Sequence, residues 1–224
     1  MMNIGKFSSE ILRGIKTIDT PHHKPTHASA FLVWYSKPTS DVKTVVELGS
    51  GTGIVAFALA KLYNLTVEGI EIQSELVELA NLGAKLNGID DKVRFRNLDV
   101  RDVKDIYKPE TFDMVVSNFP YHLSGKGKES PSKIRRLSRT ADLETIKGFI
   151  QSASYLIRNR GTFVFVFSPN ILTTVLSYLS EVNLTVQRMC FLHGAPEKEA
   201  KLVAVRGKKN GGQNLIVDPP QWGV

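Results

Sequence analysis

The fold is decided by residues 45–53, which read Val45-Val46-Glu47-Leu48-Gly49-Ser50-Gly51-Thr52-Gly53. A hydrophobic strand here runs into a turn with three glycines spaced two apart, and the helical pattern of residues 54–62 follows directly. Because glycine has no Cβ, such a turn can adopt unusual φ and ψ angles, and a ligand can lie close against its backbone. The stretch therefore predicts a strand, a ligand-binding turn and a helix.

Acidic residues beside the turn indicate which ligand it binds. A dinucleotide-binding turn has the spacing Gly-x-Gly-x-x-Gly, whereas this turn is Gly-x-Gly-x-Gly and is preceded by Glu47. A carboxylate there would repel a pyrophosphate but can pair with the ammonium of an amino-acid moiety. Glu71 ends the next expected strand, where a carboxylate accepts hydrogen bonds from ribose hydroxyls. These features predict S-adenosyl-L-methionine and disfavour an NAD-dependent oxidoreductase; the alternative is that both are ordinary surface acids.

Composition places the chain among soluble globular proteins. Its net charge of +7 is compatible with a polyanionic partner. The single cysteine, Cys190, can form no internal disulfide, which is typical of the reducing cytoplasm. The sequence has no apolar leader and no apolar run of about 20 residues. We therefore expect a cytoplasmic protein with no membrane partner.

From residue 43 onward, strand patterns alternate with helical patterns. Strands are expected at residues 44–48, 66–70, 92–96, 112–117 and 162–167, and helices at 54–63, 74–86, 103–107, 142–157 and 169–179. Such alternation predicts a parallel sheet with helices on both faces. Two further strands, at 184–192 and 201–206, leave no room for a helix between them and predict a hairpin. The expected fold is α/β: a doubly wound, mostly parallel, seven-stranded Rossmann-like sheet ending in an antiparallel hairpin.

Residues 1–42 precede the first expected strand. Apolar residues at helical spacing predict an amphipathic helix over 7–18 and a second short helix over 28–35. Three histidines lie between residues 22 and 27, but they lack the cysteines or helical spacing of strong zinc sites. A solvated or ligand-covering loop is favoured over a metal site, and no metal is expected.

The chemistry is indicated by Asn118-Phe119-Pro120-Tyr121, at the end of the fourth expected strand. An exocyclic amine or a carboxamide nitrogen is a poor nucleophile because its lone pair is delocalised. The Asn118 side-chain oxygen and the Phe119 carbonyl can accept both of its N–H bonds and favour attack on a sulfonium methyl. Pro120 would keep the turn rigid, and Tyr121 would stack on an extruded base. We predict these four residues to be catalytic; the alternative is a simple strand-ending turn.

Two further groups complete the predicted site. Asp99 is placed to accept a hydrogen bond from the cofactor's adenine, although helix capping by Asp99 or Asp102 is an alternative. The predicted cofactor-binding residues are Glu47, Gly49, Ser50, Gly51, Thr52, Gly53, Glu71, Ile72, Asp99, Val100 and Asn118. A basic stretch at residues 124–140 follows the tetrapeptide and favours phosphate binding over a merely solvated loop. The predicted RNA-binding residues are Lys126, Lys128, Lys133, Arg135, Arg136, Arg139, Lys208 and Lys209.

The glycine turn together with Asn-Phe-Pro-Tyr resembles the N6-adenine and N5-glutamine branch of class I methyltransferases. Further segments resemble the bacterial tRNA valine adenine-N6 methyltransferases: Pro25-Thr26-His27, Arg139-Thr140, Pro196-Glu197-Lys198-Glu199-Ala200, Lys208-Lys209-Asn210-Gly211-Gly212 and Asp218-Pro219-Pro220. The resemblance implies a single methyltransferase domain over 43–224 and an N-terminal helical cap over the cofactor pocket at 1–42. This sequence departs from the family pattern at Phe119, where these enzymes usually have proline, and at Thr26-His27-Ala28, where many relatives have Thr-Asp-Gly.

The resemblance implies methyl transfer from S-adenosyl-L-methionine to the N6 of an adenine in structured RNA, with tRNA as the partner. One alternative is a protein glutamine N5-methyltransferase. Such enzymes usually carry a substrate-binding domain before the glycine turn, where this sequence has only about 42 residues. Another is an RNA-binding module that kept the fold and lost catalysis, which the intact acidic and glycine positions oppose.

Overall fold

The computed structural model describes residues 5–18, 20, 23–119, 122–123, 140–141 and 143–223. The strands are β1 (Thr44–Leu48), β2 (Thr66–Glu71), β3 (Val93–Asn97), β4 (Phe112–Asn118), β5 (His122–Leu123), β6 (Thr140–Ala141), β7 (Ile157–Phe167), β8 (Leu184–His193), β9 (Ala200–Lys209), β10 (Ile216–Val217) and β11 (Gln221–Trp222). The α-helices are α1 (His27–Tyr35), α2 (Ile54–Tyr63), α3 (Ser74–Leu86), α4 (Val103–Ile106), α6 (Leu143–Leu156) and α7 (Leu172–Glu181). The 3-10 helices are η1 (Ser9–Leu12), η2 (Val100–Asp102) and η3 (Pro169–Ile171).

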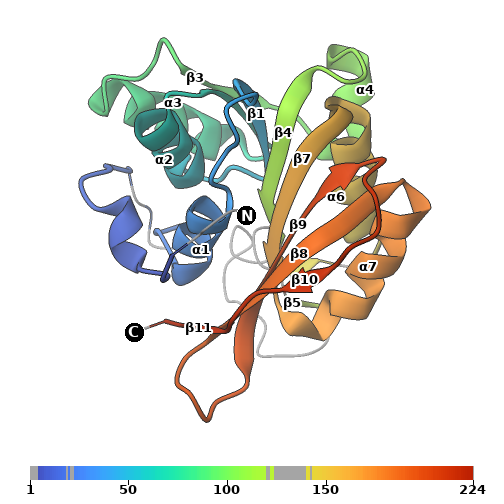
Figure 1. The fold of residues 1–224 in the computed structure, drawn as a ribbon. Helices are drawn as coiled ribbons and strands as arrows, with labels where there is room; N and C mark the ends of the chain where they lie inside the picture. Colours follow the sequence, from blue (N-terminus) through green and yellow to red (C-terminus); the bar gives the residue numbers. More distant parts are fainter. Residues whose placement is uncertain are drawn as a thin grey trace.

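The main sheet confirms the predicted fold class and corrects the predicted number of strands. Its order is β10-β8-β9-β7-β4-β1-β2-β3 (Figure 1). Along this order, the neighbouring strands among β3, β2, β1, β4 and β7 pair in parallel. Strand β9 is antiparallel to both β7 and β8. The prediction of seven strands was wrong, since β10 and β11 also pair with β8 and make nine. Each is two residues long, too short to show a period-two pattern.

Helices cover both faces of the sheet. α1, α2 and α3 lie on one face, and α4, α6 and α7 lie on the other (Figure 1). Successive strand residues point to opposite faces, so Val45 belongs to the first core and Val46 to the second. Residues 54–60 of α2 are all buried, which holds the helix that follows the glycine turn firmly against the sheet.

The N-terminal segment packs on the first of these faces. The helix predicted over residues 7–18 is only the single turn of η1, because Arg13 is extended and Gly14 has a φ of +77°. Phe7 still contributes its buried ring, with its centroid 5.4 Å from that of Phe31. The second predicted helix is confirmed as α1, and the Arg206 guanidinium of β9 donates to the carbonyl of Tyr35 at its end (3.0 Å).

The C-terminal tail is anchored by a buried polar cluster. Asp218 accepts a hydrogen bond from the Tyr35 hydroxyl (2.6 Å) and pairs with the Arg188 guanidinium. Burial, reinforced by the Asp218 carboxylate, raises the pKa of Tyr35, so its hydroxyl stays a donor. Beyond this cluster, the Gly223 N–H donates to the carbonyl of His193 (2.8 Å). These contacts fix β11 beside the end of β8.

The strand register places several loops at one edge of the sheet. The carboxyl ends of β1, β2, β4 and β7 lie at the same edge because these strands are parallel. Since β8 runs antiparallel to β9, and β9 to β7, the loop between β8 and β9 lies at this edge too. We call it the carboxyl edge. Among the described residues, no helix combines the length and hydrophobicity needed to span a membrane.

Candidate active site

The glycine turn follows β1 at the carboxyl edge. Gly49, Gly51 and Gly53 have φ angles of +73°, +55° and +88°, a region that L side chains rarely adopt. The N–H groups of Gly49 and Ser50 donate to the carbonyl of Ile70 at 2.8 and 3.1 Å, which ties the turn to the end of β2. A Cβ on Gly53 would lie 2.5 Å from the Phe95 ring, whereas one on Gly51 would meet nothing within 4 Å. Gly53 is thus required by packing, and Gly51 leaves an open approach to the backbone.

Glu47 lies under the turn and is 3% exposed. Its Oε2 accepts a hydrogen bond from the N–H of Ala56 in the first turn of α2 (3.0 Å). Burial raises the pKa of Glu47 well above its ordinary value, and the nearby charge of Glu71 raises it further. Its Oε1 has no hydrogen-bond partner in the described part of the chain. The remaining oxygen of this largely buried carboxylate is suited to a cationic donor.

Glu71 ends β2 and is 6% exposed. Its Oε2 accepts from the N–H of Gly51 (2.9 Å), and its Oε1 accepts from the N–H of Gln73 (3.0 Å). Burial raises the pKa of this carboxyl, and these two backbone bonds oppose the rise. A carboxylate has lone pairs for about four hydrogen bonds, so it keeps capacity for a ligand. Next to it, Ile72 is 53% exposed and offers an apolar surface.

Asp99 has the capping geometry that the sequence left as an alternative. Its side chain accepts from the backbone N–H of Arg101 (2.9 Å) at the start of η2 and forms an ion pair with the Arg101 guanidinium (2.6 Å). The hydrogen bond from Arg101 lowers the pKa of Asp99. The following residue, Val100, is buried. Asp99 is therefore an ionised acceptor whose position is held by its neighbour.

Asn118 ends β4, directly beside the glycine turn, because Ser117 pairs with Leu48 at the end of β1. The Oδ1 of Asn118 is buried and has no hydrogen-bond partner among the described residues. Leaving such an acceptor unpaired costs about 1–3 kcal/mol. The other two residues of the predicted tetrapeptide, Pro120 and Tyr121, lie outside the described residues.

The Phe119 ring belongs to the hydrophobic core. It is 0% exposed, and its centroid lies 4.7 Å from that of Phe165 and 5.7 Å from that of Phe149. Its N–H donates to the carbonyl of Val166 in β7 (2.9 Å). The side chain at this position of the tetrapeptide therefore packs beneath the site, and only the Phe119 backbone is left for a catalytic role.

The predicted RNA-binding residues are not all brought together. Six of them, Lys126, Lys128, Lys133, Arg135, Arg136 and Arg139, lie outside the described residues. Lys208 and Lys209 end β9, which runs antiparallel to β7, so they lie at the opposite edge of the sheet from Asn118. Lys209 is also paired with Glu110 (2.9 Å). The direction of β9 thus separates these two lysines from the carboxyl edge.

Two supporting residues were not identified from the sequence. Gln73 holds the Glu71 carboxylate, and Phe149 of α6 lies 3.2 Å from where a Cβ on Gly49 would stand. Gln73 could have been found from its place two residues after the acid. Phe149 is 100 residues from the turn and carries no local signal. In the described ranges, no cluster of three or more histidine, cysteine or acidic side chains is arranged for a metal ion.

Comparisons with known proteins agree with this geometry. A family model described as a methyltransferase domain matches residues 39–198. The tRNA1(Val) (adenine(37)-N6)-methyltransferase of Phocaeicola vulgatus is 23% identical over 79% of this chain and 73% of its own length. The release factor glutamine methyltransferase of Aliivibrio fischeri is 34% identical over 50% of this chain and 38% of its own length.

Solved structures show the same fold. A predicted O-methyltransferase from Agrobacterium tumefaciens superposes with a TM-score of 0.69 at 18% identity, covering 87% of this chain and 86% of that one. Geranyl diphosphate methyltransferase in complex with S-adenosylmethionine gives a TM-score of 0.60 at 16% identity, covering 81% and 84%. With most of the chain matched by the family model, a glycine turn after β1 and methyltransferases among its structural neighbours, the protein belongs to the class I methyltransferase family.

Proposed function

We propose that this protein transfers a methyl group from S-adenosyl-L-methionine to the exocyclic N6 of an adenine in structured RNA, with tRNA as the substrate class. The observation that carries the proposal is the buried Oδ1 of Asn118 beside the glycine turn, which has no hydrogen-bond partner among the residues that the structure describes. An acceptor at that place suits a substrate with N–H donors, and the adenine amino group has two. The names of the relatives that modify tRNA adenine support the same substrate.

The residues around the turn fit S-adenosyl-L-methionine. The open backbone at Gly51 and the free Oε1 of Glu47 suit its amino-acid portion. Glu71 would accept from the ribose hydroxyls, with Ile72 against the adenine, and Asp99 with Val100 would hold the adenine edge. When bound, this cofactor supplies an electrophilic methyl group on a sulfonium.

Asn118 and the Phe119 carbonyl would do the chemical work on the target. Accepting both N–H bonds of the amine turns its lone pair toward the methyl group, and these bonds strengthen as positive charge develops on the nitrogen. No strong base is needed before attack, because the nitrogen becomes acidic only after it is methylated. Residues 1–42 would cover the cofactor, Pro120 and Tyr121 would hold the base, and the basic residues between 126 and 139 would bind phosphates.

The affinity for S-adenosyl-L-methionine should rise with pH on the acid side. Only ionised Glu47 pairs with the ammonium, and burial raises the pKa of this carboxyl, so protonation should weaken binding at a higher pH than for an exposed glutamate. Calorimetric titration from mildly acidic to mildly alkaline pH measures the effect. Glu47→Gln should reduce the acid-side dependence to the part contributed by Glu71, whose pKa burial also raises, and an unchanged pH profile in this variant would exclude the pairing.

Two substitutions in the glycine turn should affect different properties, one mainly the cofactor affinity and the other mainly the stability of the fold. Gly51→Ala should cost only about 1 kcal/mol of stability, from its positive φ, yet weaken cofactor binding at least about tenfold, because the methyl group occupies the ligand's approach. Gly53→Ala should destabilise the fold by roughly 3 kcal/mol, because its Cβ would overlap the Phe95 ring. Urea denaturation and cofactor titration of both variants separate the two effects. Equal loss of stability in both would contradict this reading of Gly51.

The function is tested by incubating the protein with methyl-labelled S-adenosyl-L-methionine and total tRNA, total rRNA or a protein extract, followed by nucleoside analysis. The expected product is N6-methyladenosine in tRNA. Label confined to rRNA would change the substrate class, and absence of label in RNA would overturn the proposal.

One alternative has an observation of its own. The release factor glutamine methyltransferase of A. fischeri is 34% identical over half of this chain, and a glutamine carboxamide presents the same two N–H donors to Asn118. Label appearing only in the protein extract, at glutamine, would establish that function in place of RNA methylation.

A further inference from the structure

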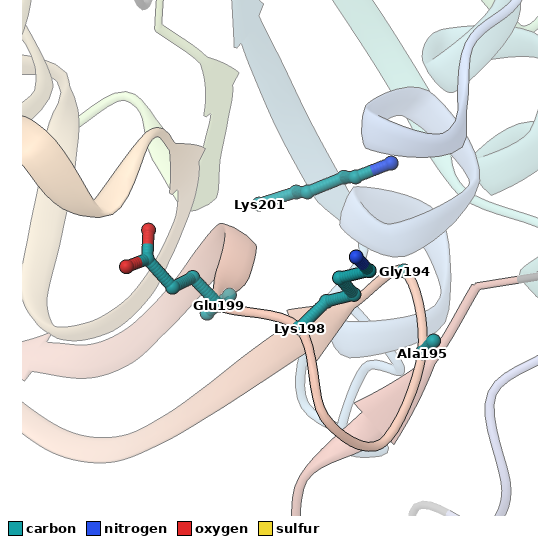
Figure 2. A pocket seen from close by; sticks show the side chains of 6 residues that line it. Gly194, Ala195, Lys198, Glu199 and Lys201 are labelled. Carbon is teal, nitrogen blue, oxygen red and sulfur yellow. The ribbon is translucent and has the colours of Figure 1, made fainter.

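The loop between β8 and β9 borders a shallow, solvent-open cavity of about 620 Å³. It is lined by Gly194, Ala195, Lys198, Glu199, Ala200 and Lys201 (Figure 2). None of these residues belongs to the cofactor or catalytic site described above. We call residues 194–201, which are the connecting loop and the first two residues of β9, the hairpin loop.

The cavity lining carries two lysines against one glutamate, Glu199, while Glu197 of the hairpin loop is not part of the lining. Figure 2 shows the amines of Lys198 and Lys201 directed to the same side of the hairpin loop, while the Glu199 carboxylate points the other way. Neither lysine forms an ion pair within the described part of the chain, in contrast to Lys209. The Nζ of Lys201 lies 3.0 Å from where a Cβ on Gly194 would stand, so the absence of a side chain there lets the amine lie over the loop backbone.

The hairpin loop is held in place by contacts at its base. The His193 Nδ1 donates to the carbonyl of Lys198 (2.7 Å), since a carbonyl can only accept. The His193 ring lies 5.2 Å from that of Trp222, which pairs with His193 as part of β11. These contacts close the loop on itself, so less entropy is lost when its lysines bind a ligand.

The loop also lies on the same edge as the predicted catalytic residue. Asn118 is in register with Val166 of β7, and Val166 with Ala204 of β9. The path from β4 over β7 to β9 crosses two strand spacings, which amount to about 10 Å. The three residues back along β9 from Ala204 to Lys201 also span about 10 Å. The backbones of Lys201 and Asn118 are therefore on the order of 15 Å apart, within reach of a nucleotide strand whose target base is held at Asn118.

We propose that Lys198 and Lys201 bind phosphates of the substrate RNA that flank the target nucleotide. The inference rests on the proposed function and extends it by naming an RNA contact in the hairpin loop. Two amines that form no ion pair with any described residue, held on a preformed loop, suit the repeated charges of an RNA backbone. They would position the strand and leave the reacting atoms to Asn118.

The test compares the full-length protein with its Lys198→Gln/Lys201→Gln variant. We expect the Kd and the KM for unfractionated tRNA to rise roughly tenfold, with kcat within about twofold and cofactor affinity unchanged. The slope of log K against log salt should become shallower by about 1.4 to 1.8, the value for two lost phosphate contacts. Fluorescence anisotropy with labelled tRNA and steady-state methylation supply these numbers.

A matched control is the Lys85→Gln/Lys108→Gln variant. It removes the same charge from two exposed positions near the opposite edge of the sheet, Lys85 in the last turn of α3 and Lys108 just before β4, and should behave like wild type. Equal effects of the two variants on tRNA affinity would mean that the loss comes from the change in net charge alone, which would overturn the proposal. Lost affinity for poly-L-glutamate with unchanged tRNA binding would overturn it in favour of an acidic protein partner. If the wild type methylates no RNA, the proposed function itself fails; RNA methylation with an unaltered KM in Lys198→Gln/Lys201→Gln refutes this inference alone.

Discussion

Replacing Asn118 with alanine should slow methyl transfer by at least about 100-fold while changing cofactor affinity only a few-fold. The buried Oδ1 has no partner in the described structure, so it is available to accept an N–H of the target. Removing one preorganised group that stabilises a transition state typically costs a factor of about 10² to 10³ in kcat. Single-turnover transfer of labelled methyl to tRNA measures the chemical step, and calorimetry measures the cofactor affinity.

Asn170→Ala is a suitable control for this variant. Asn170 is exposed, lies just beyond β7 at the carboxyl edge, and should be replaceable without loss of rate. Transfer that persists in Asn118→Ala at near wild-type rate would remove the proposed mechanism. Loss of cofactor binding in parallel with the rate would move Asn118 from the target base to the cofactor.

Phe119→Ala should lower the free energy of unfolding by about 3–5 kcal/mol, the usual cost of deleting a buried phenyl ring. The ring is fully buried and contacts three other phenylalanines, Phe149, Phe165 and Phe167. Urea denaturation at a fixed temperature measures the change. Phe119→Leu, which keeps much of the volume, should cost clearly less, and a loss below about 1 kcal/mol in Phe119→Ala would contradict the core assignment.

Phe119→Pro restores the residue usual in the enzymes that this tetrapeptide resembles, yet it should also be destabilising. Besides the ring, it removes the N–H that donates to Val166, and a lost hydrogen bond adds about 1 kcal/mol. Phe119 is therefore matched to the aromatic residues of β7 and α6 that pack around it. A substitution at position 119 should be made together with substitutions in that aromatic core.

Local patterns predicted the class of fold and the place of several candidate site residues in it. β1, α2 and α3 form where the periodicity indicated, and Glu47, Glu71 and Asn118 all lie at the carboxyl edge. The helix over residues 7–18 was wrong, because its apolar spacing is satisfied by one short turn once Gly14 adopts a positive φ. The two extra strands, β10 and β11, were missed because their own sequences show no strand pattern. They are strands because they pair with β8.

By itself, the sequence determined the class of fold and the ligand turn, because both depend on periodicity and on glycine at fixed local spacing. Only the tertiary structure decided which side chains share an edge of the sheet. The reversal of direction at β9 takes Lys208 away from Asn118 and brings Lys201 toward it, although both lysines lie in the same strand. The tertiary structure also buried the Phe119 ring under the site and left the Asn118 oxygen without a hydrogen-bond partner in the described part of the chain. Strand direction and packing partners are long-range properties, and a short motif does not encode them.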